Sequence, residues 1–255
     1  MADERHEQTG GQGAAPAHDA LTAGSGADST VAETTVPENT GTGSTLPPAQ
    51  DDSQPTTLPE GALAQTALDQ LFGTARTPRR WSTRPVADDV LRQLYTLASL
   101  GPTSGNCSPA RLVFLKGTDA RERLRPALSA GNVNRVMGAP VIAIVAHDPL
   151  FFEQLPVLCP GEDLRSWFAA DVGLSEETAF RNGTLQGAYT IMAARALGLD
   201  VLPVSGFDQS MVEDAFLAET GWRANFLLCL GHGDLTGLPP RAPRLDFAQA
   251  CRVVD

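Results

Sequence analysis

Seven consecutive apolar residues, Pro-Val-Ile-Ala-Ile-Val-Ala at positions 140–146, set the first limit on the fold. The run is too short to form a free-standing helix. A strand without polar alternation is typical of the interior of a sheet that is covered on both faces. We therefore expect residues 140–146 to form a central strand beneath layers of helices.

The sequence on either side of this run predicts interleaved helices and strands without a strict βαβ order. The longest predicted helix covers residues 175–197, with Ser175 as its N-cap and Gly198 as the residue that ends it. Asp88 or Asp89 is expected to cap an earlier helix, and the glycine-rich residues 231–234 are interpreted as a turn. The pattern favours an α+β, or layered α/β, domain. The other predicted helices cover residues 61–73, 90–98, 119–128 and 210–217, and the other strands cover 112–116, 200–205 and 225–230.

The first sixty residues differ sharply in composition from the rest. They hold ten acidic residues and one basic residue, and they lack Phe, Trp, Tyr and Ile. Such a segment buries too little apolar surface to offset its ordering entropy, so we expect residues 1–60 to be a disordered acidic tail and 61–255 to be the domain. With 20 acidic and 18 basic residues, the domain lacks the basic stripe that nucleic-acid binding needs.

Targeting and metal-binding signals are missing from the sequence. There is no basic segment followed by an apolar one at the N-terminus, and no apolar run near twenty residues. These features favour a cytoplasmic protein that does not enter the membrane. The four cysteines and four histidines show no ligand-like spacing, so we expect neither a structural metal nor a disulfide framework.

Polar and basic loops are the candidates for ligand binding. Residues 101–111 form a polar loop between a helix and a strand, and such a loop suits a polar ligand. Two basic loops, one with Arg76, Thr77, Arg79 and Arg80 and one with Arg241 and Arg244, have the chemistry to hold a phosphate monoester. Solvated surface charge is the alternative for these arginines. Dinucleotide, Walker A and serine-hydrolase motifs are not found in the sequence.

Four segments, in order, resemble motifs of the FMN-dependent nitroreductase family. Arg-Thr-Pro-Arg-Arg-Trp (76–81) is similar to the family's Arg-Ser-x-Arg-x-Phe, and Pro-Thr-Ser-Gly-Asn-Cys-Ser-Pro (102–109) to its Pro-Ser-Ser-x-Asn-x-Gln-Pro. Leu-Gly-Leu-Asp-Val-Leu-Pro-Val-Ser-Gly-Phe (197–207) resembles Leu-Gly-Leu-x-x-x-Pro-Ile-x-Gly-Phe. Arg244 stands at the family's C-terminal phosphate-binding arginine. Thr77 in place of Ser keeps the hydroxyl, whereas Ala110 replaces the usual Trp.

The resemblance implies an intertwined homodimer with a mostly antiparallel sheet and one FMN per subunit at the interface. It also implies that the backbone N–H of Ser205 donates toward flavin N5, as the catalytic contact, and that Asn106 reaches across the dimer. NADPH or NADH would deliver the hydride in a ping-pong reaction. The implied cofactor-binding residues are Arg76, Thr77, Arg79, Pro102, Thr103, Ser104, Asn106, Pro203, Val204, Ser205, Gly206, Arg241 and Arg244.

Further segments, among them 101–111, 122–129, 165–168, 176–182 and 185–189, resemble a subgroup of this family, the malonic semialdehyde reductases of the pyrimidine-degradation (Rut) pathway. The subgroup implies reduction of a small aldehyde to 3-hydroxypropionate. Arg165 and Arg181 are candidates for the substrate carboxylate, with structural ion pairs as the alternative. Trp167 and Phe168 are candidates for a roof over the flavin, with simple packing as the alternative. A broad nitro- or quinone reductase and a flavin-binding module without turnover remain the other interpretations.

Overall fold

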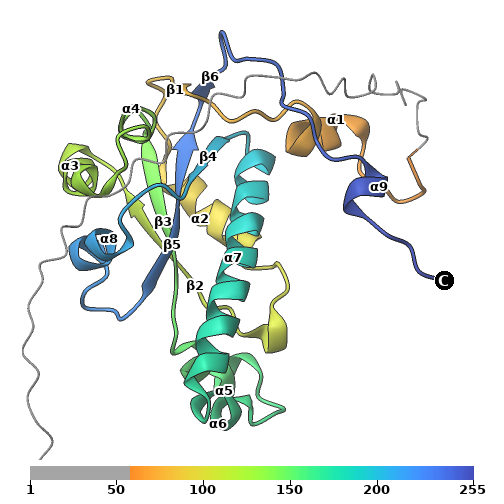
Figure 1. Ribbon diagram of the computed structural model, residues 1–255, viewed down its shortest axis with the longest axis vertical. Helices are drawn as coiled ribbons and strands as arrows, with labels where there is room; N and C mark the ends of the chain where they lie inside the picture. Colours follow the sequence, from red (N-terminus) through yellow and green to blue (C-terminus); the bar gives the residue numbers. More distant parts are fainter. Residues whose placement is uncertain (1–57) are drawn as a thin grey trace, which may run out of the picture. The chain divides into compact units, whose positions relative to one another are not determined.

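The computed structural model describes residues 58–255 (Figure 1), so the predicted tail, apart from its last three residues, lies outside the described part. A four-stranded sheet, antiparallel throughout, has the order β2-β3-β5-β4. Helices cover both of its faces, which confirms the predicted α+β architecture. The strands are β2 (Ala110–Leu115), β3 (Val141–His147), β4 (Asp200–Val204) and β5 (Arg223–Gly231).

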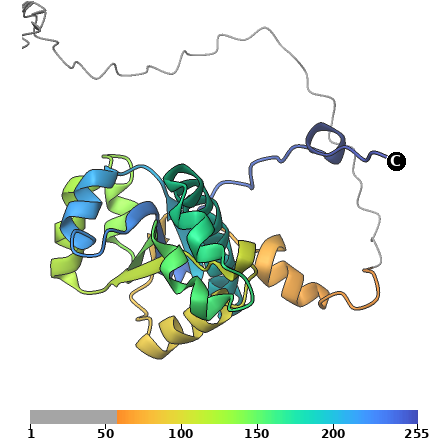
Figure 2. The same ribbon diagram turned by 90° about the horizontal axis from the view of Figure 1, so that it is seen from below.

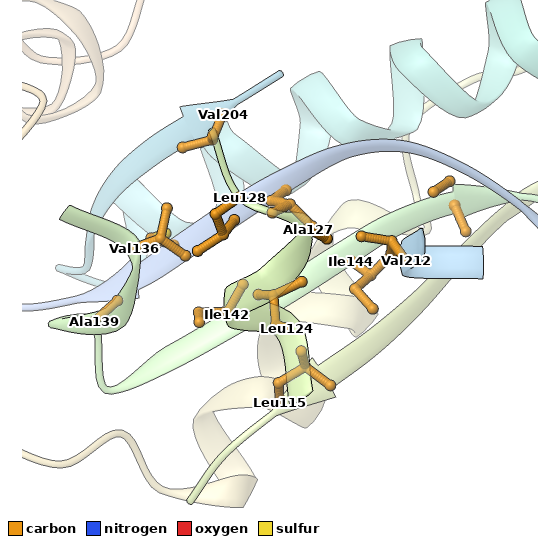
Figure 3. Packing of buried hydrophobic residues seen from close by; sticks show 14 of the residues in the cluster. Leu115, Leu124, Ala127, Leu128, Val136, Ala139, Ile142, Ile144, Val204 and Val212 are labelled. Atoms are coloured by element: carbon orange, nitrogen blue, oxygen red, sulfur yellow. The ribbon is translucent and has the colours of Figure 1, made fainter. Parts of the chain in front are cut away.

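Strand β3 is the buried centre of the sheet, as its composition predicts. All of its residues are buried, and it pairs with β2 on one side and β5 on the other. Ile142 and Ile144 face a cluster that includes Leu115, Leu124 and Val136 (Figure 3). Burying each isoleucine contributes about 1.5–3 kcal/mol.

Helices α2 (Asp88–Ala98) and α7 (Val172–Ala196) cover one face of the sheet, and α3 (Thr118–Leu124) and α8 (Gln209–Phe216) cover the other (Figures 1 and 2). Gly187 lets α7 approach the sheet closely, because a Cβ atom there would lie 2.5 Å from the ring of Phe226. The predicted helix at 119–128 ends earlier, since Arg125–Ala127, which contains Pro126, forms a 3₁₀ turn after α3.

The helix ends differ in part from the prediction. Helix α7 starts three residues earlier than expected, because Asp171 and not Ser175 is its N-cap and accepts the backbone N–H of Leu174 at 3.0 Å. Gly198 follows the helix with φ +74°, as predicted for a residue that ends it. The N-cap of α2 is Ala87 without a side-chain cap, and the carboxylate of Asp88 instead pairs with Lys116.

Several short elements complete the described chain. Residues 231–234 are not a simple turn, since β6 (Gly233–Asp234) pairs with β1 (Arg80–Trp81) in an antiparallel ribbon. An ion pair of 2.9 Å between Arg80 and Asp234 supports that ribbon. The predicted helix at 61–73 starts later, as α1 (Gln65–Leu68) and a π-helical turn (Asp69–Gly73). The remaining helical elements are η2 (Ser104–Asn106), α4 (Val133–Met137), η4 (Phe151–Gln154), α5 (Leu155–Leu158), α6 (Leu164–Ala169) and α9 (Phe247–Ala250).

Candidate cofactor site

The two predicted basic loops meet in space. They line one cavity of about 380 Å³, which we call the arginine cavity. Six arginines contribute to it, and among the described residues that line it there is no carboxylate. Two of the six arginines were not expected from the sequence, since they come from α4 and from the last turn of α7. The arginines are Arg76, Arg79, Arg135, Arg195, Arg241 and Arg244, and Thr77 adds a hydroxyl.

Backbone carbonyl groups hold several of these guanidinium groups in place. Arg241 donates to the carbonyl oxygens of Gly73 at 2.9 Å and Ala75 at 2.8 Å, and so it joins the C-terminal segment to the first basic loop. Arg76 donates to the carbonyl of Pro239 in the reverse direction. Arg195 donates to the carbonyl of Leu71 at 2.7 Å. Hydrogen bonds to backbone carbonyls therefore hold these arginines of the cavity, and none of them forms an ion pair within residues 58–255.

Uncompensated positive charge is the main electrostatic property of the arginine cavity. Burial, together with the neighbouring charge of Arg241, lowers the pKa of Arg195. Gathering like charges costs free energy unless an anion binds among them. A phosphate monoester carries a charge of about −1.5 to −2 and accepts paired hydrogen bonds from guanidinium groups. The donor set therefore fits the phosphate of FMN.

Strand β4 runs past this cavity at the edge of the sheet. Its Leu202 lines the arginine cavity, while Pro203, Val204 and Ser205 line a second cavity of about 650 Å³ against α7. We call it the α7 cavity, because Phe180, Thr184, Ala188 and Ile191 of α7 form its other wall. An edge strand leaves alternate backbone N–H and C=O groups without a strand partner, so a ligand can bind along β4.

The turn after β4 is held firmly. The carbonyl oxygen of Gly206 accepts hydrogen bonds from Ser129 Oγ at 2.8 Å and Asn132 Nδ2 at 3.1 Å. A Cβ atom at position 206 would lie 2.4 Å from Asn132 Nδ2 and 2.7 Å from Ser129 Oγ, so a larger residue would displace the side chains that hold this turn. The backbone around Ser205 is consequently fixed in the orientation that lines the α7 cavity.

The polar loop 101–111 is anchored by buried side chains of α7. Asn182, which is 5% exposed, accepts the backbone N–H of Ser104 at 2.9 Å, and Gln186 accepts that of Ala110 at 2.8 Å. The hydroxyl of Tyr189 donates to the carbonyl of Pro102 at 2.9 Å. These amides were not predicted as functional residues, although their four-residue spacing places them on one face of the helix.

Within the loop, Thr103 and Asn106 make local contacts. Thr103 Oγ1 accepts the N–H of Ser108 at 3.2 Å, and Asn106 Nδ2 donates to the carbonyl of Leu158 at 2.8 Å. Asn106 lies in the left-handed region with φ 52°, which asparagine tolerates better than most residues. Cys107 is buried, and burial raises the pKa of its thiol.

In a single chain, the loop and the arginine cavity do not form one site. The loop is attached at Asn182, Gln186 and Tyr189, whereas the cavity lies at Arg195 of the same helix, and no residue of the loop lines that cavity. At 1.5 Å per residue, these three anchors lie about 20, 14 and 9 Å from Arg195 along the axis of α7. The predicted phosphate and strand residues are therefore brought together, and the loop residues lie elsewhere.

The predicted substrate residues are engaged in other contacts. Arg165 forms a two-pronged pair with Glu153 at 2.8 and 2.9 Å, and Arg181 pairs with Glu177 one turn earlier on α7. Phe168 is only 4% exposed and packs edge-on against Phe151, with ring centroids 4.9 Å apart. These contacts correspond to the structural alternatives for both arginines and for Phe168. Trp167, in contrast, is 56% exposed.

Two further features concern membranes and metals. No helix among residues 58–255 combines the length and apolar character that crossing a bilayer requires. Over the same residues, no three side chains of the His, Cys, Asp and Glu types gather as metal ligands would.

Comparison with known proteins identifies the family to which this chain belongs, and the fold and the arginine cavity are consistent with that family. The model of the nitroreductase family matches residues 74–232. The chain therefore belongs to the nitroreductase family. A proposed NADH dehydrogenase/NAD(P)H nitroreductase of Burkholderia lata is 55% identical over 191 residues, which are 75% of this chain and 98% of that protein.

Solved structures share the fold at lower identity. A proposed nitroreductase from Bacillus subtilis superposes with a TM-score of 0.68 at 18% identity, and covers 75% of this chain and 100% of its own. A proposed nitroreductase from Exiguobacterium sibiricum, solved in complex with FMN, gives a TM-score of 0.65 at 19% identity, with 76% and 99% covered. These similarities confirm the predicted nitroreductase-like fold.

Proposed function

We propose that this protein is an NAD(P)H-dependent oxidoreductase that binds FMN with its phosphate in the arginine cavity. The observation that carries the proposal is the gathering of six arginines beside an edge strand, with no carboxylate from residues 58–255 in the lining. Arg76, Thr77, Arg79 and Arg244 are the proposed phosphate ligands. Arg241 is proposed to act with them and also to hold the two basic loops together, because it donates to the backbone carbonyls of Phe72, Gly73 and Ala75.

Strand β4 is the proposed support for the flavin ring. Pro203, Val204, Ser205 and Gly206 would lie along it, with the backbone N–H of Ser205 directed to N5. When bound, FMN would carry a hydride from NADH or NADPH to the acceptor in two half-reactions. A backbone donor needs no particular side chain, which accounts for the lack of a histidine or carboxylate at this position of β4.

A homodimer is the proposed functional form. The loop with Pro102, Thr103, Ser104 and Asn106 is anchored about 9 to 20 Å from Arg195 along α7, and none of these residues lines the arginine cavity, which supports a site completed by a second subunit. We propose that Asn106 of the partner subunit contacts the flavin of the first. Exposed apolar side chains on α7, including Phe180 at 53% and Leu185 at 42%, are available for such an interface.

The proposed substrate is malonic semialdehyde, reduced to 3-hydroxypropionate in the cytoplasm. This finer proposal is supported by the segments shared with the malonic semialdehyde reductase subgroup. Of the two candidate arginines, Arg181 is easier to recruit to the substrate carboxylate, because its pair with Glu177 is exposed and such pairs contribute little. Arg165 uses both Nε and Nη2 for Glu153.

Steady-state kinetics tests the substrate. We expect kcat/KM for malonic semialdehyde to exceed that for quinones and nitroarenes. The reverse order would favour the alternative, a broad nitro- or quinone reductase.

Anaerobic mixing of the purified yellow protein with NADPH and with NADH tests whether it is an enzyme. Loss of the oxidised-flavin absorbance is the expected result with at least one nucleotide. Retained absorbance with both would support a flavin-binding module without turnover.

A further inference from the structure

A third cavity lies at the start of strand β4. It has a volume of about 390 Å³ and lies between the π-helical turn Asp69–Gly73 and the C-terminal end of α7. Asp200 and Val201 line it, so we call it the Asp200 cavity. Its volume falls within the range of small-molecule sites.

The Asp200 cavity adjoins the arginine cavity. Ala75, Arg76 and Arg195 line both of them. Along β4, Asp200 and Val201 line the Asp200 cavity, Leu202 lines the arginine cavity, and Pro203 to Ser205 line the α7 cavity. Of these, the Asp200 and arginine cavities share lining residues, so one elongated anionic ligand has groups within reach in both.

We propose that this site accepts FAD as well as FMN, with the adenylate half of FAD in the Asp200 cavity. The inference rests on the proposed function, which places the flavin ring at Pro203–Ser205 and the phosphate in the arginine cavity. In FAD, the ring, the ribityl chain, the phosphates and the adenosine follow one another. The three cavities follow β4 in the same order.

The charges at the junction fit a second phosphate. Arg76 and Arg195 stand between the two cavities, and neither forms an ion pair within residues 58–255. A pyrophosphate has oxygens on two phosphorus atoms, so it can accept hydrogen bonds from guanidinium groups on both sides of the junction. A monoester confined to the arginine cavity leaves the side of Arg76 and Arg195 that faces the Asp200 cavity without a phosphate, although the carboxylates of Asp69 and Asp200 also line that cavity.

The polar groups beyond the junction fit a ribose. Asp200 accepts the backbone N–H of Gly233 with Oδ2 at 2.8 Å, which fixes the orientation of its carboxylate. Asp69 is similarly held, since its Oδ1 accepts Gln65 Nε2 at 2.9 Å. Carboxylates accept hydrogen bonds from ribose hydroxyls, and the two aspartates line the same cavity. The Asp200 cavity therefore offers acceptors where the arginine cavity offers only cationic donors and a hydroxyl.

Reconstitution of the full-length apoprotein with each flavin tests the inference. The dissociation constants of FMN and FAD are measured by calorimetry, and chromatography of the bound flavin verifies that FAD is not hydrolysed. We expect the two constants to lie within about tenfold of each other. Binding of FMN with FAD more than about 100-fold weaker would overturn this inference and leave the proposed function intact. Failure of both flavins to bind would instead contradict the proposed function.

A cavity-filling variant locates the adenylate half. Thr66 is exposed on α1 and lines the Asp200 cavity but not the arginine cavity, so Thr66→Trp obstructs only the former. We expect it to weaken FAD at least about tenfold and FMN less than about threefold. The matched control is Ala64→Trp, which adds the same side chain at an exposed residue just before α1. Equal effects of Thr66→Trp on both flavins would overturn the inference.

Discussion

Replacing Asn182 with alanine tests whether α7 holds the polar loop in position. Asn182 is only 5% exposed, and its amide oxygen accepts the backbone N–H of Ser104 at 2.9 Å. The change leaves that N–H without its partner in a partly buried place. An unsatisfied buried donor costs about 1–3 kcal/mol.

This cost is divided between folding and FMN binding, because a loop that detaches in the free protein must be ordered again when FMN binds. We expect the two losses to sum to about 1–3 kcal/mol. If the cost falls entirely on folding, the melting temperature drops by about 2–12 °C for a domain of this size. If it falls entirely on binding, the dissociation constant of FMN rises about 5- to 150-fold.

Urea unfolding of the apoprotein and calorimetric titration with FMN, at equal protein concentrations, measure the two parts. Thr190→Val is the matched control, since Thr190 is 2% exposed on the same helix and donates only to the carbonyl of Gln186 at 2.9 Å. If the summed loss for Asn182→Ala exceeds that of the control by less than about 0.5 kcal/mol, the anchoring argument is refuted.

Further predictions concern the phosphate ligands, packing and pH. Arg244→Ala should raise the dissociation constant of FMN by about 10- to 150-fold in a calorimetric titration, because it removes a charged hydrogen bond to the phosphate. Arg84 lies outside the arginine cavity, so Arg84→Ala should leave that constant unchanged. Gly101→Ala would place a Cβ atom 2.0 Å from an aromatic ring of α7, so we expect the unfolding free energy measured in urea to fall by about 1–3 kcal/mol. Gly131→Ala is the control and should change this free energy little, because no atom lies within 4 Å of a Cβ atom built there. Burial lowers the pKa of His147 below its ordinary 6.5, so the unfolded chain binds a proton more readily than the folded one. The unfolding free energy should therefore fall as pH decreases from about 6.5 toward the lower folded-state pKa, and His147→Gln should make that slope shallower.

Local sequence patterns predicted those helices and strands whose structure depends on their own residues. The apolar run at 140–146 became β3, and Gly198 ended α7 because a left-handed residue was needed there. The start of α7 could not be predicted from candidate caps alone. Ser175 is 3% exposed inside the first turn, and the N–H of Asp171 is already bonded to Phe168 in the preceding helix, so packing between α6 and α7 selects the cap.

Contacts between distant segments account for what the sequence did not predict. The pairing of Trp81 with Gly233 joins two short strands across about 150 residues, and neither strand has a pattern of its own. Arg135 and Arg195 reach the arginine cavity from separate helices, and nothing nearby in the sequence marks them as ligands. Arg76 and Arg244 could be identified from the sequence as candidates for phosphate binding, but only the family resemblance linked them to one site.

Helix α7 also determines where the chain can change in length. It carries the anchors of the polar loop at Asn182 and Gln186 and a wall of the arginine cavity at Arg195. One residue inserted between Tyr189 and Arg195 would turn everything after it by about 100° and shift it by about 1.5 Å, so Arg195 would leave its cavity. Residues 182–195 should therefore reject insertions and deletions, whereas the exposed turn at 160–163 can absorb them.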